Sequence, residues 1–129
     1  MLAVETGDGS PHAATVHFAH TENPFVFFFE TAQDSKKGQS ILSKKETRAS
    51  VVLGTIESTM MTLQMDGLIQ VLGDNEKELY DKIYLGKFPE KEGKFKDQKI
   101  FPFIFTPNWW RFTDWTKPGG KQIINSDQK

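Results

Sequence analysis

Three consecutive residues, Ser35, Lys36 and Lys37, are the group in this sequence best suited to holding a phosphate. They stand at the predicted start of a short helix over residues 35–44, where Asp34 or Ser35 would cap the first turn. A helix start presents unpaired backbone N–H groups and a positive dipole end, while lysines add charge and a hydroxyl adds a donor. The same residues also suit an ordinary capped helix start that faces solvent, and composition alone favours that interpretation.

The three histidines, His12, His17 and His20, have a spacing that argues against a metal site. On one extended strand over residues 12–20, His12 and His20 share a face about 26 Å apart, and His17 points to the other face. The chain also has no cysteine that could complete a ligand set. It carries no Gly-rich nucleotide loop and no Ser-His-Asp context, so we expect no metal and assign no catalytic residue.

Length and composition predict one globular domain over residues 1–129. With 16 basic and 17 acidic residues the net charge is -1, so no nucleic-acid partner is expected. The longest apolar run, residues 25–29, is too short to cross a bilayer, and the sequence shows no signal-peptide pattern. We therefore expect a cytoplasmic protein with no membrane partner.

The pattern along the chain predicts about seven strands and two short helices. Segments 1–6, 12–20 and 25–31 are expected to form an antiparallel meander, with the third strand apolar on both faces and therefore central and covered. Later strands are expected at residues 49–56, 60–72 with a bulge at Asp66 and Gly67, 99–106, and 108–115, the last two joined at Pro107.

The first helix would bury Ile41 and Leu42. A second helix is expected from Asp74 or Asn75 through Tyr84, with Leu79, Ile83 and Tyr80 facing inward. A charged loop would cover residues 87–98, and the chain would end in a loose tail from about residue 117. This count indicates a mainly β fold, a small antiparallel barrel with helices at its rim.

Four segments resemble the pyridoxamine 5'-phosphate oxidase-like family, the FMN-binding split barrels, and they occur in family order over nearly the whole chain. Residues 9–18 resemble its second strand, and residues 35–37 with 48–51 resemble its phosphate-binding helix and the next strand. Residues 63–67 and 109–115 resemble its "Q-x-E/D-G" and "W-x-R-x-x-D-aromatic" strands. The resemblance implies a six-stranded split barrel that forms a homodimer and binds FMN in clefts at the dimer interface.

Because of the resemblance, we expect Ser35, Lys36 and Lys37 to bind the FMN phosphate rather than to form only an ordinary helix start. Thr31 would supply a second hydroxyl. A flavin ring needs an apolar slot with backbone or amide groups at its pyrimidine edge. The remaining cofactor-binding candidates are the second-strand residues, an amide, and two residues that would cover the ring from either chain: Thr15, Val16, His17, Phe18, Gln64, Trp110 and Arg111. Because strand residues alternate, we expect only one of the two adjacent tryptophans to face inward.

Two departures from the family bear on function. The chain begins inside the first strand, where family members usually carry a helix first. The Tyr-x-x-x-Arg-x-x-x-Ser clamp for the vitamin B6 phosphate is also missing, since Tyr80 is followed by Tyr84 and Phe88, and the only arginines are Arg48 and Arg111.

We therefore predict an FMN-dependent oxidoreductase of unknown small-molecule substrate that does not oxidise vitamin B6. The alternatives are a non-catalytic flavin-binding or flavin-storing protein, the same barrel holding haem or a deazaflavin, and a structural dimer without cofactor.

Overall fold

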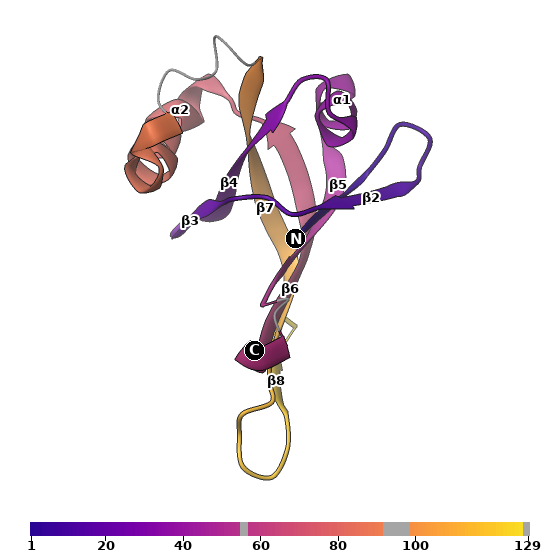
Figure 1. Ribbon diagram of the computed structural model, residues 1–129, viewed down its shortest axis with the longest axis vertical. Coiled ribbons are helices and arrows are strands. Elements are labelled where there is room, and N and C mark those ends of the chain that lie inside the picture. The colour runs from indigo at the N-terminus through magenta and orange to yellow at the C-terminus, as the bar shows by residue number, and fades with distance from the viewer. Residues whose placement is uncertain (55–56, 92–98, 128–129) are drawn as a thin grey trace.

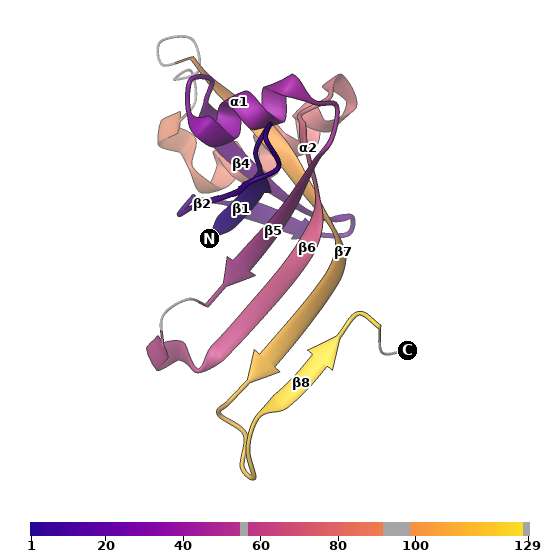
Figure 2. The same ribbon diagram turned by 90° about the vertical axis from the view of Figure 1, so that its right-hand side faces the viewer.

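The computed structural model describes residues 1–54, 57–91 and 99–127. Its eight-stranded antiparallel sheet has the order β2-β1-β5-β6-β7-β4-β3, with β8 added on β7. The strands are β1 (Leu2–Glu5), β2 (Pro11–Ala14), β3 (Ala19–Glu22), β4 (Phe25–Ala32), β5 (Thr47–Leu53), β6 (Met61–Val71), β7 (Ile100–Asp114) and β8 (Gln122–Asn125). Both helices lie at one end of the sheet, and the long strands extend away from them (Figures 1 and 2). The expected mainly β fold with two short helices is confirmed.

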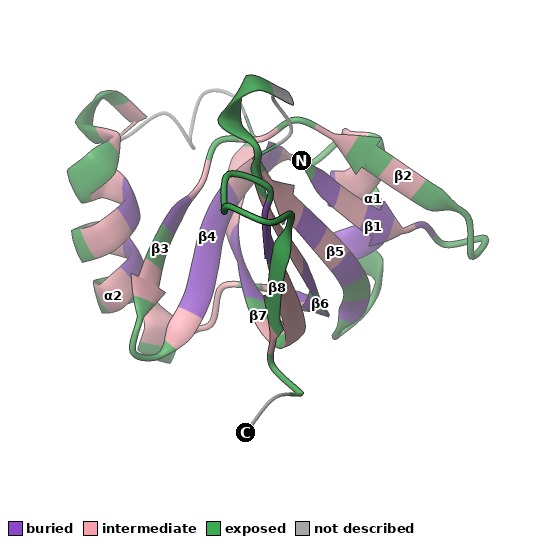
Figure 3. Ribbon diagram, turned by 90° about the horizontal axis from the view of Figure 1, so that it is seen from below, coloured by how far each residue is buried: buried purple, intermediate pink, exposed green. Residues whose placement is uncertain are grey.

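Strand β4 is covered on both faces, as its sequence predicted. Phe27 and Phe29 point into the barrel core, whereas Val26 and Phe28 pack against a second cluster that contains Tyr80 and is formed with the second helical segment. Figure 3 shows this strand as an almost continuous buried band. The apolar run is thus buried within one chain, so it offers no exposed surface to a partner. The apolar residues of β4 are therefore explained by burial on both faces within one chain, and they are not evidence for a dimer.

Strands β6 and β7 form the longest ladder of the sheet, and a bulge between Asp66 and Gly67 shifts their register. A Cβ on Gly67 would lie 2.2 Å from the carbonyl oxygen of Thr106, so the close approach of the two strands requires glycine here. The expected bulge is confirmed. The expected break at Pro107 is wrong, because β7 runs through this residue, which stands opposite Gly67 at the bulge.

Three further expectations are corrected by the structure. The expected strand over residues 12–20 is two short strands, β2 paired with β1 and β3 paired with β4, so the first segments are two hairpins rather than a continuous meander. Leu42 is 47% exposed, and only Ile41 of the expected pair is buried. The tail expected to be loose forms β8, in which Ile124 stands opposite Phe112 of β7.

The helices are α1 (Lys36–Ser43) and α2 (Lys77–Tyr80). A 3-10 turn, η2 (Asp74–Glu76), leads into α2, and a π-helical turn, η3 (Asp81–Leu85), continues it. Tyr80 and Tyr84 are its most buried side chains, while the expected inward residues Leu79 and Ile83 are half-buried beside them. Of the charged loop expected over residues 87–98, residues 92–98 lie outside the described residues, and a 3-10 turn, η4 (Pro89–Lys91), precedes them. Among the described helices, none is long and apolar enough to cross a membrane.

Candidate functional site

A cleft of about 400 Å³ opens where α1, η3 and the connection between β2 and β3 meet. Six of its lining residues were predicted from the sequence: Thr15, Val16, His17, Thr31, Ser35 and Lys37. Its volume lies within the range of ~300–1,000 Å³ common for small-ligand pockets. The fold therefore joins the proposed phosphate group to the proposed ring-binding segment, although they lie far apart in the sequence.

Ser35 is the N-cap of α1, and its hydroxyl is already engaged there. Its Oγ accepts from the backbone N–H of Gly38 at 3.0 Å and lies 2.9 Å from both the carbonyl oxygen of Ala32 and Thr31 Oγ1. A hydroxyl has one proton, so Ser35 can donate to only one neighbour at a time. The capping interpretation holds for Ser35, and its first role at this site is to orient the helix start.

The two lysines that follow Ser35 diverge. Lys37 lines the cleft, whereas Lys36 lines a separate surface hollow with Asp8 and Gln39. Lys37 is half-buried and makes no hydrogen bond or ion pair with any residue that the structure describes. Burial lowers the pKa of its ammonium group, as expected for a cation held away from bulk water without a counter-ion. Lys37 therefore suits an anionic ligand, and the pairing of Lys36 with it is not seen.

Residues 15–18 connect β2 to β3 and stand outside the ladders of the sheet. Thr15, Val16 and His17 line the cleft, and the His17 ring meets Phe88 edge-on with centroids 5.8 Å apart. Phe18 instead packs against the barrel core, and its carbonyl oxygen accepts from Lys87 Nζ at 2.7 Å. Three of the four predicted residues thus reach the cleft.

Gln64, Trp110 and Arg111 lie elsewhere on the chain, on the ladder of β6 and β7. Arg111 donates to the side-chain oxygen of Gln64, while Trp110 packs against the barrel core. Trp109 lies on the opposite face of the strand from Trp110, and its Nε1 donates to Asp127 at 3.0 Å. As expected, only one of the two adjacent tryptophans packs against the core. None of these residues lines the cleft.

Glu30, Tyr84 and Lys91 form a polar cluster that lines the same cleft and that the sequence did not predict. Lys91 Nζ lies 3.6 Å from Glu30 Oε1 and donates to the Tyr84 hydroxyl at 3.1 Å. Burial, followed by the hydrogen bond and charge of Glu30, raises the pKa of the Tyr84 phenol above its ordinary value. The one hint of this cluster in the sequence was Glu30, a charged residue directly after the apolar run 25–29.

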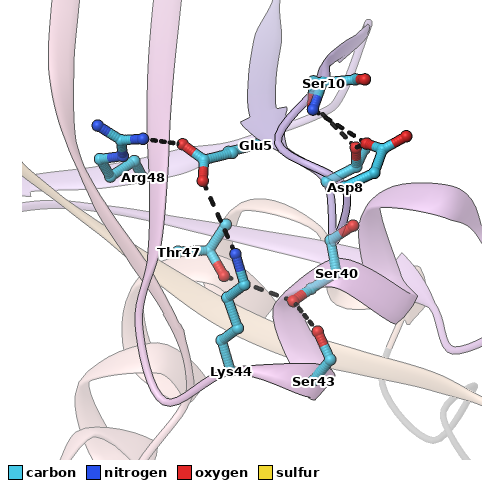
Figure 4. Close-up of polar contacts among 9 residues, drawn as sticks. Glu5, Asp8, Ser10, Ser40, Ser43, Lys44, Thr47 and Arg48 are labelled. Carbon is cyan, nitrogen blue, oxygen red and sulfur yellow. Dashed lines mark hydrogen bonds and ion pairs between the residues drawn. The ribbon is translucent and has the colours of Figure 1, made fainter.

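Polar contacts at the far end of α1 fix the helix against the sheet (Figure 4). The hydroxyls of Ser43 and Thr47 both donate to the carbonyl oxygen of Ser40. Beyond the helix, Lys44 and Arg48 both form ion pairs with Glu5 of β1. These contacts tie the helix and the start of β5 to neighbouring elements, so the orientation of the helix start does not depend on Ser35 alone.

No protein-family model and no curated protein matches the sequence. Solved structures do match. A heme-binding protein from Mycobacterium smegmatis aligns with a TM-score of 0.71 and 11% identity over 98% of this chain and 52% of its own. A pyridoxamine 5'-phosphate oxidase-related, FMN-binding protein from Nostoc punctiforme aligns with a TM-score of 0.64 and 15% identity over 99% of this chain and 81% of its own.

A third match is a protein related to general stress protein 26, of the pyridoxinephosphate oxidase family, from Clostridium acetobutylicum. It aligns with a TM-score of 0.61 and 16% identity over 98% of this chain and 84% of its own. The chain has the split-barrel fold of the pyridoxamine 5'-phosphate oxidase-like proteins. The resemblance in the sequence is confirmed at the level of this fold. The chain spans about half the length of the heme-binding protein.

Proposed function

We propose that this split barrel binds FMN in the cleft and acts as a flavin-dependent oxidoreductase. The observation that carries the proposal is Lys37, a half-buried cation without a partner among the described residues, which shares one cleft with Thr15, Val16 and His17. Lys37 and the N–H groups that begin α1 would hold the phosphate, with Thr31 and Ser35 around it. The segment at residues 15–17 would lie along the ring.

FMN, when bound, supplies the electron-transfer chemistry. The chain's own residues bind the phosphate, and Val16 and the rings of Phe88 and His17 limit the access of water to the slot. We assign no catalytic acid or base. The match to an FMN-binding protein of this fold supports the cofactor. The vitamin B6 clamp is absent from the sequence, so we propose a different, unidentified substrate.

We further propose a cytoplasmic homodimer. Gln64, Trp110 and Arg111 resemble cofactor-binding residues of the family, yet they lie outside this chain's cleft. A second copy would bring its own ladder of β6 and β7 to the cleft and complete it. Exposed apolar side chains at the far end of that ladder and on β8 also favour burial against a second chain. These side chains are Met60, Met61, Trp115, Ile123 and Ile124.

Haem is a second candidate because His17 lines the cleft and one matching structure is of a heme-binding protein. A neutral imidazole is a common axial ligand of haem iron. Lys37 and the helix start could hold a haem propionate as well as the phosphate of FMN. FMN is the first candidate because residues 9–18 and 35–37, which supply the residues 15–17 and Lys37 of the cleft, resemble segments of the FMN-binding split barrels.

The test is titration of the purified protein with FMN, riboflavin and hemin, followed by flavin fluorescence and by absorption. We expect FMN to bind more tightly than riboflavin and hemin to give no Soret shift. NADH or NADPH oxidation with FMN bound would support the oxidoreductase, whereas tight FMN binding without turnover would support a storage or binding protein. If none of the three ligands binds, the structural-dimer alternative takes the place of the proposal.

A further inference from the structure

A second cavity, of about 690 Å³, lies on the other side of the helical segment from the cleft. It is larger than the cleft, and neither the sequence motifs nor the proposed cofactor accounts for it. The end of β6, the start of β7 and the segment η2-α2-η3 form its walls. Ile100 lines both cavities, and Tyr80, which lines the second, stacks on Tyr84, which lines the first, with ring centroids 5.3 Å apart.

Half of the residues that line this second cavity are apolar. Val71 and Leu72 come from β6, Pro102 and Ile100 from β7, and Leu85 from η3. Val71, the last residue of β6, is 42% exposed. An apolar side chain left open to a cavity of this size gains free energy when a ligand covers it, because apolar area then leaves water.

The polar groups of the cavity carry an excess of negative charge. Asp81 is paired with Lys77 at 2.8 Å, so these two charges offset each other. Asp74 also lines the cavity and makes no ion pair with any residue that the structure describes. Tyr80, a buried residue, also lines this cavity. The charge balance of the lining residues therefore favours a cation over an anion.

One helical segment lines both cavities. Within η3, Tyr84 lines the cleft and the adjacent Leu85 lines the second cavity. Neighbouring side chains on a helix point in different directions, so consecutive residues of one segment can reach two separate spaces. Single π-helical turns such as η3 are rare and occur frequently at functional sites.

We propose that this second cavity is a binding site for a small organic ammonium ion, an amine carried on an apolar or aromatic body. The body lies against Leu72, Leu85 and Pro102, and the ammonium group lies at the mouth beside Asp74. The ligand is separate from the cofactor, and the site does not depend on the cleft being filled.

The test uses three probes of one shape and different charge: naphthylmethylamine, naphthylmethanol and naphthoate. Binding to the full chain is measured by isothermal titration calorimetry at neutral pH, with and without FMN. We expect the amine to bind with one site per chain, the alcohol to bind more weakly and naphthoate to bind least. Binding of the amine is expected in both the presence and the absence of FMN, which separates this site from the proposed cofactor cleft.

Three variants locate the site. Asp74→Asn removes the unpaired carboxylate and should weaken amine binding by up to about fivefold, the range for an exposed ion pair, while leaving the alcohol unchanged. Glu78→Gln makes the same charge change on an exposed residue of α2 outside the cavity and should leave all three affinities unchanged. Val71→Arg puts a cation at the mouth and should weaken the amine by about tenfold or more.

Val71 is partly exposed, so its substitution is expected to leave the fold intact, and thermal unfolding checks this. The proposal is overturned if the amine does not bind, if naphthoate binds as tightly as the amine, or if Val71→Arg binds the amine like the unaltered protein. It is also overturned if Asp74→Asn and Glu78→Gln have equal effects.

Discussion

Arg111 donates from Nε and from a terminal nitrogen to the same oxygen of Gln64, at 3.1 and 2.9 Å, across the ladder of β6 and β7. Gln64 and Arg111 lie on one face of the sheet, and Met65 and Trp110 lie on the other, since neighbouring residues on a strand point to alternate faces. The amide oxygen of Gln64 is engaged by Arg111, and its NH₂ group remains as the donor toward any ligand. Within one chain the pair is separate from Lys37, so only a second copy can bring such a pair to the cleft.

Arg111→Ala should weaken FMN binding if the partner's pair completes the site. A lost hydrogen bond to a charged group costs about 1.5–3 kcal/mol, which corresponds to roughly tenfold to a hundredfold in affinity. Flavin fluorescence titration measures this, and light scattering at micromolar concentration should give the dimer mass. FMN affinity should also fall when the protein is diluted until monomers form.

The matched control for that variant is Arg48→Ala, the other arginine, which is exposed and paired with Glu5. It should leave FMN affinity nearly unchanged. A monomer mass together with full FMN affinity in Arg111→Ala would show that one chain holds the cofactor alone.

Lys37→Ala should weaken FMN binding by about tenfold or more, because a cleft-lining cation without a partner among the described residues is lost, whereas Lys91, which also lines the cleft, is paired with Glu30. Riboflavin lacks the phosphate, so its affinity should barely change. Lys36→Ala is the control at the adjacent position, since Lys36 lines a different hollow, and it should have little effect on either flavin. Equal effects of the two substitutions would point to general charge attraction rather than to a phosphate site.

The sequence predicted the mainly β fold, the buried strand β4, the bulge at Asp66 and Gly67, and a helix cap at Asp34 or Ser35, because these features depend on local patterns of apolar residues, glycine and capping side chains. It did not predict that Lys36 and Lys37 diverge, since adjacent positions on a helix point about 100° apart and only packing shows which one meets the cleft. It also missed the cluster of Glu30, Tyr84 and Lys91, whose members lie up to 61 residues apart and are joined only by tertiary contacts.

Gly38→Ala should destabilise the protein and distort the phosphate end of the cleft. A Cβ at this position would lie 2.1 Å from the carbonyl oxygen of Ala32 and 2.9 Å from Ser35 Oγ, so the backbone must move. Alanine has the higher helix propensity, by about 1 kcal/mol, and a gain in stability is the result expected without that clash. We expect instead a net loss of about 1–3 kcal/mol, as in other overpacked sites. Denaturant unfolding shows whether the substitution lowers or raises the free energy of unfolding.

Exposed Gln39 is the matched control on the same helix. Gln39→Ala should change the free energy of unfolding by less than about 0.5 kcal/mol. If Gly38→Ala is as stable as the unaltered protein, the helix start can shift without cost, and the close contact with Ala32 does not fix the site.

Tyr84→Phe should change how stability depends on pH above about 10, the ordinary pKa of tyrosine. The phenol of Tyr84 has its pKa raised in the folded state by burial and by Glu30, so the native chain keeps a proton that the unfolded chain loses. Where the native state binds more protons, the free energy of unfolding falls as pH rises, by up to about 1.4 kcal/mol per pH unit for one group. The stabilising effect of the protonated phenol is complete below pH 10 and is lost above it.

Burial also raises the pKa of Tyr80, so this residue contributes a similar slope in both proteins. Between about pH 10 and 11, the free energy of unfolding should therefore fall more steeply for the unaltered protein than for Tyr84→Phe. Lysines titrate alike in both proteins, so their contributions cancel when the two curves are compared. At pH 7 the variant should lose about 1 kcal/mol, because the hydrogen bond from Lys91 is removed. Urea unfolding of both proteins at several pH values gives the two curves. Parallel curves would mean that the Tyr84 phenol titrates alike in the folded and unfolded chains, and that the cluster with Glu30 and Lys91 opens to water.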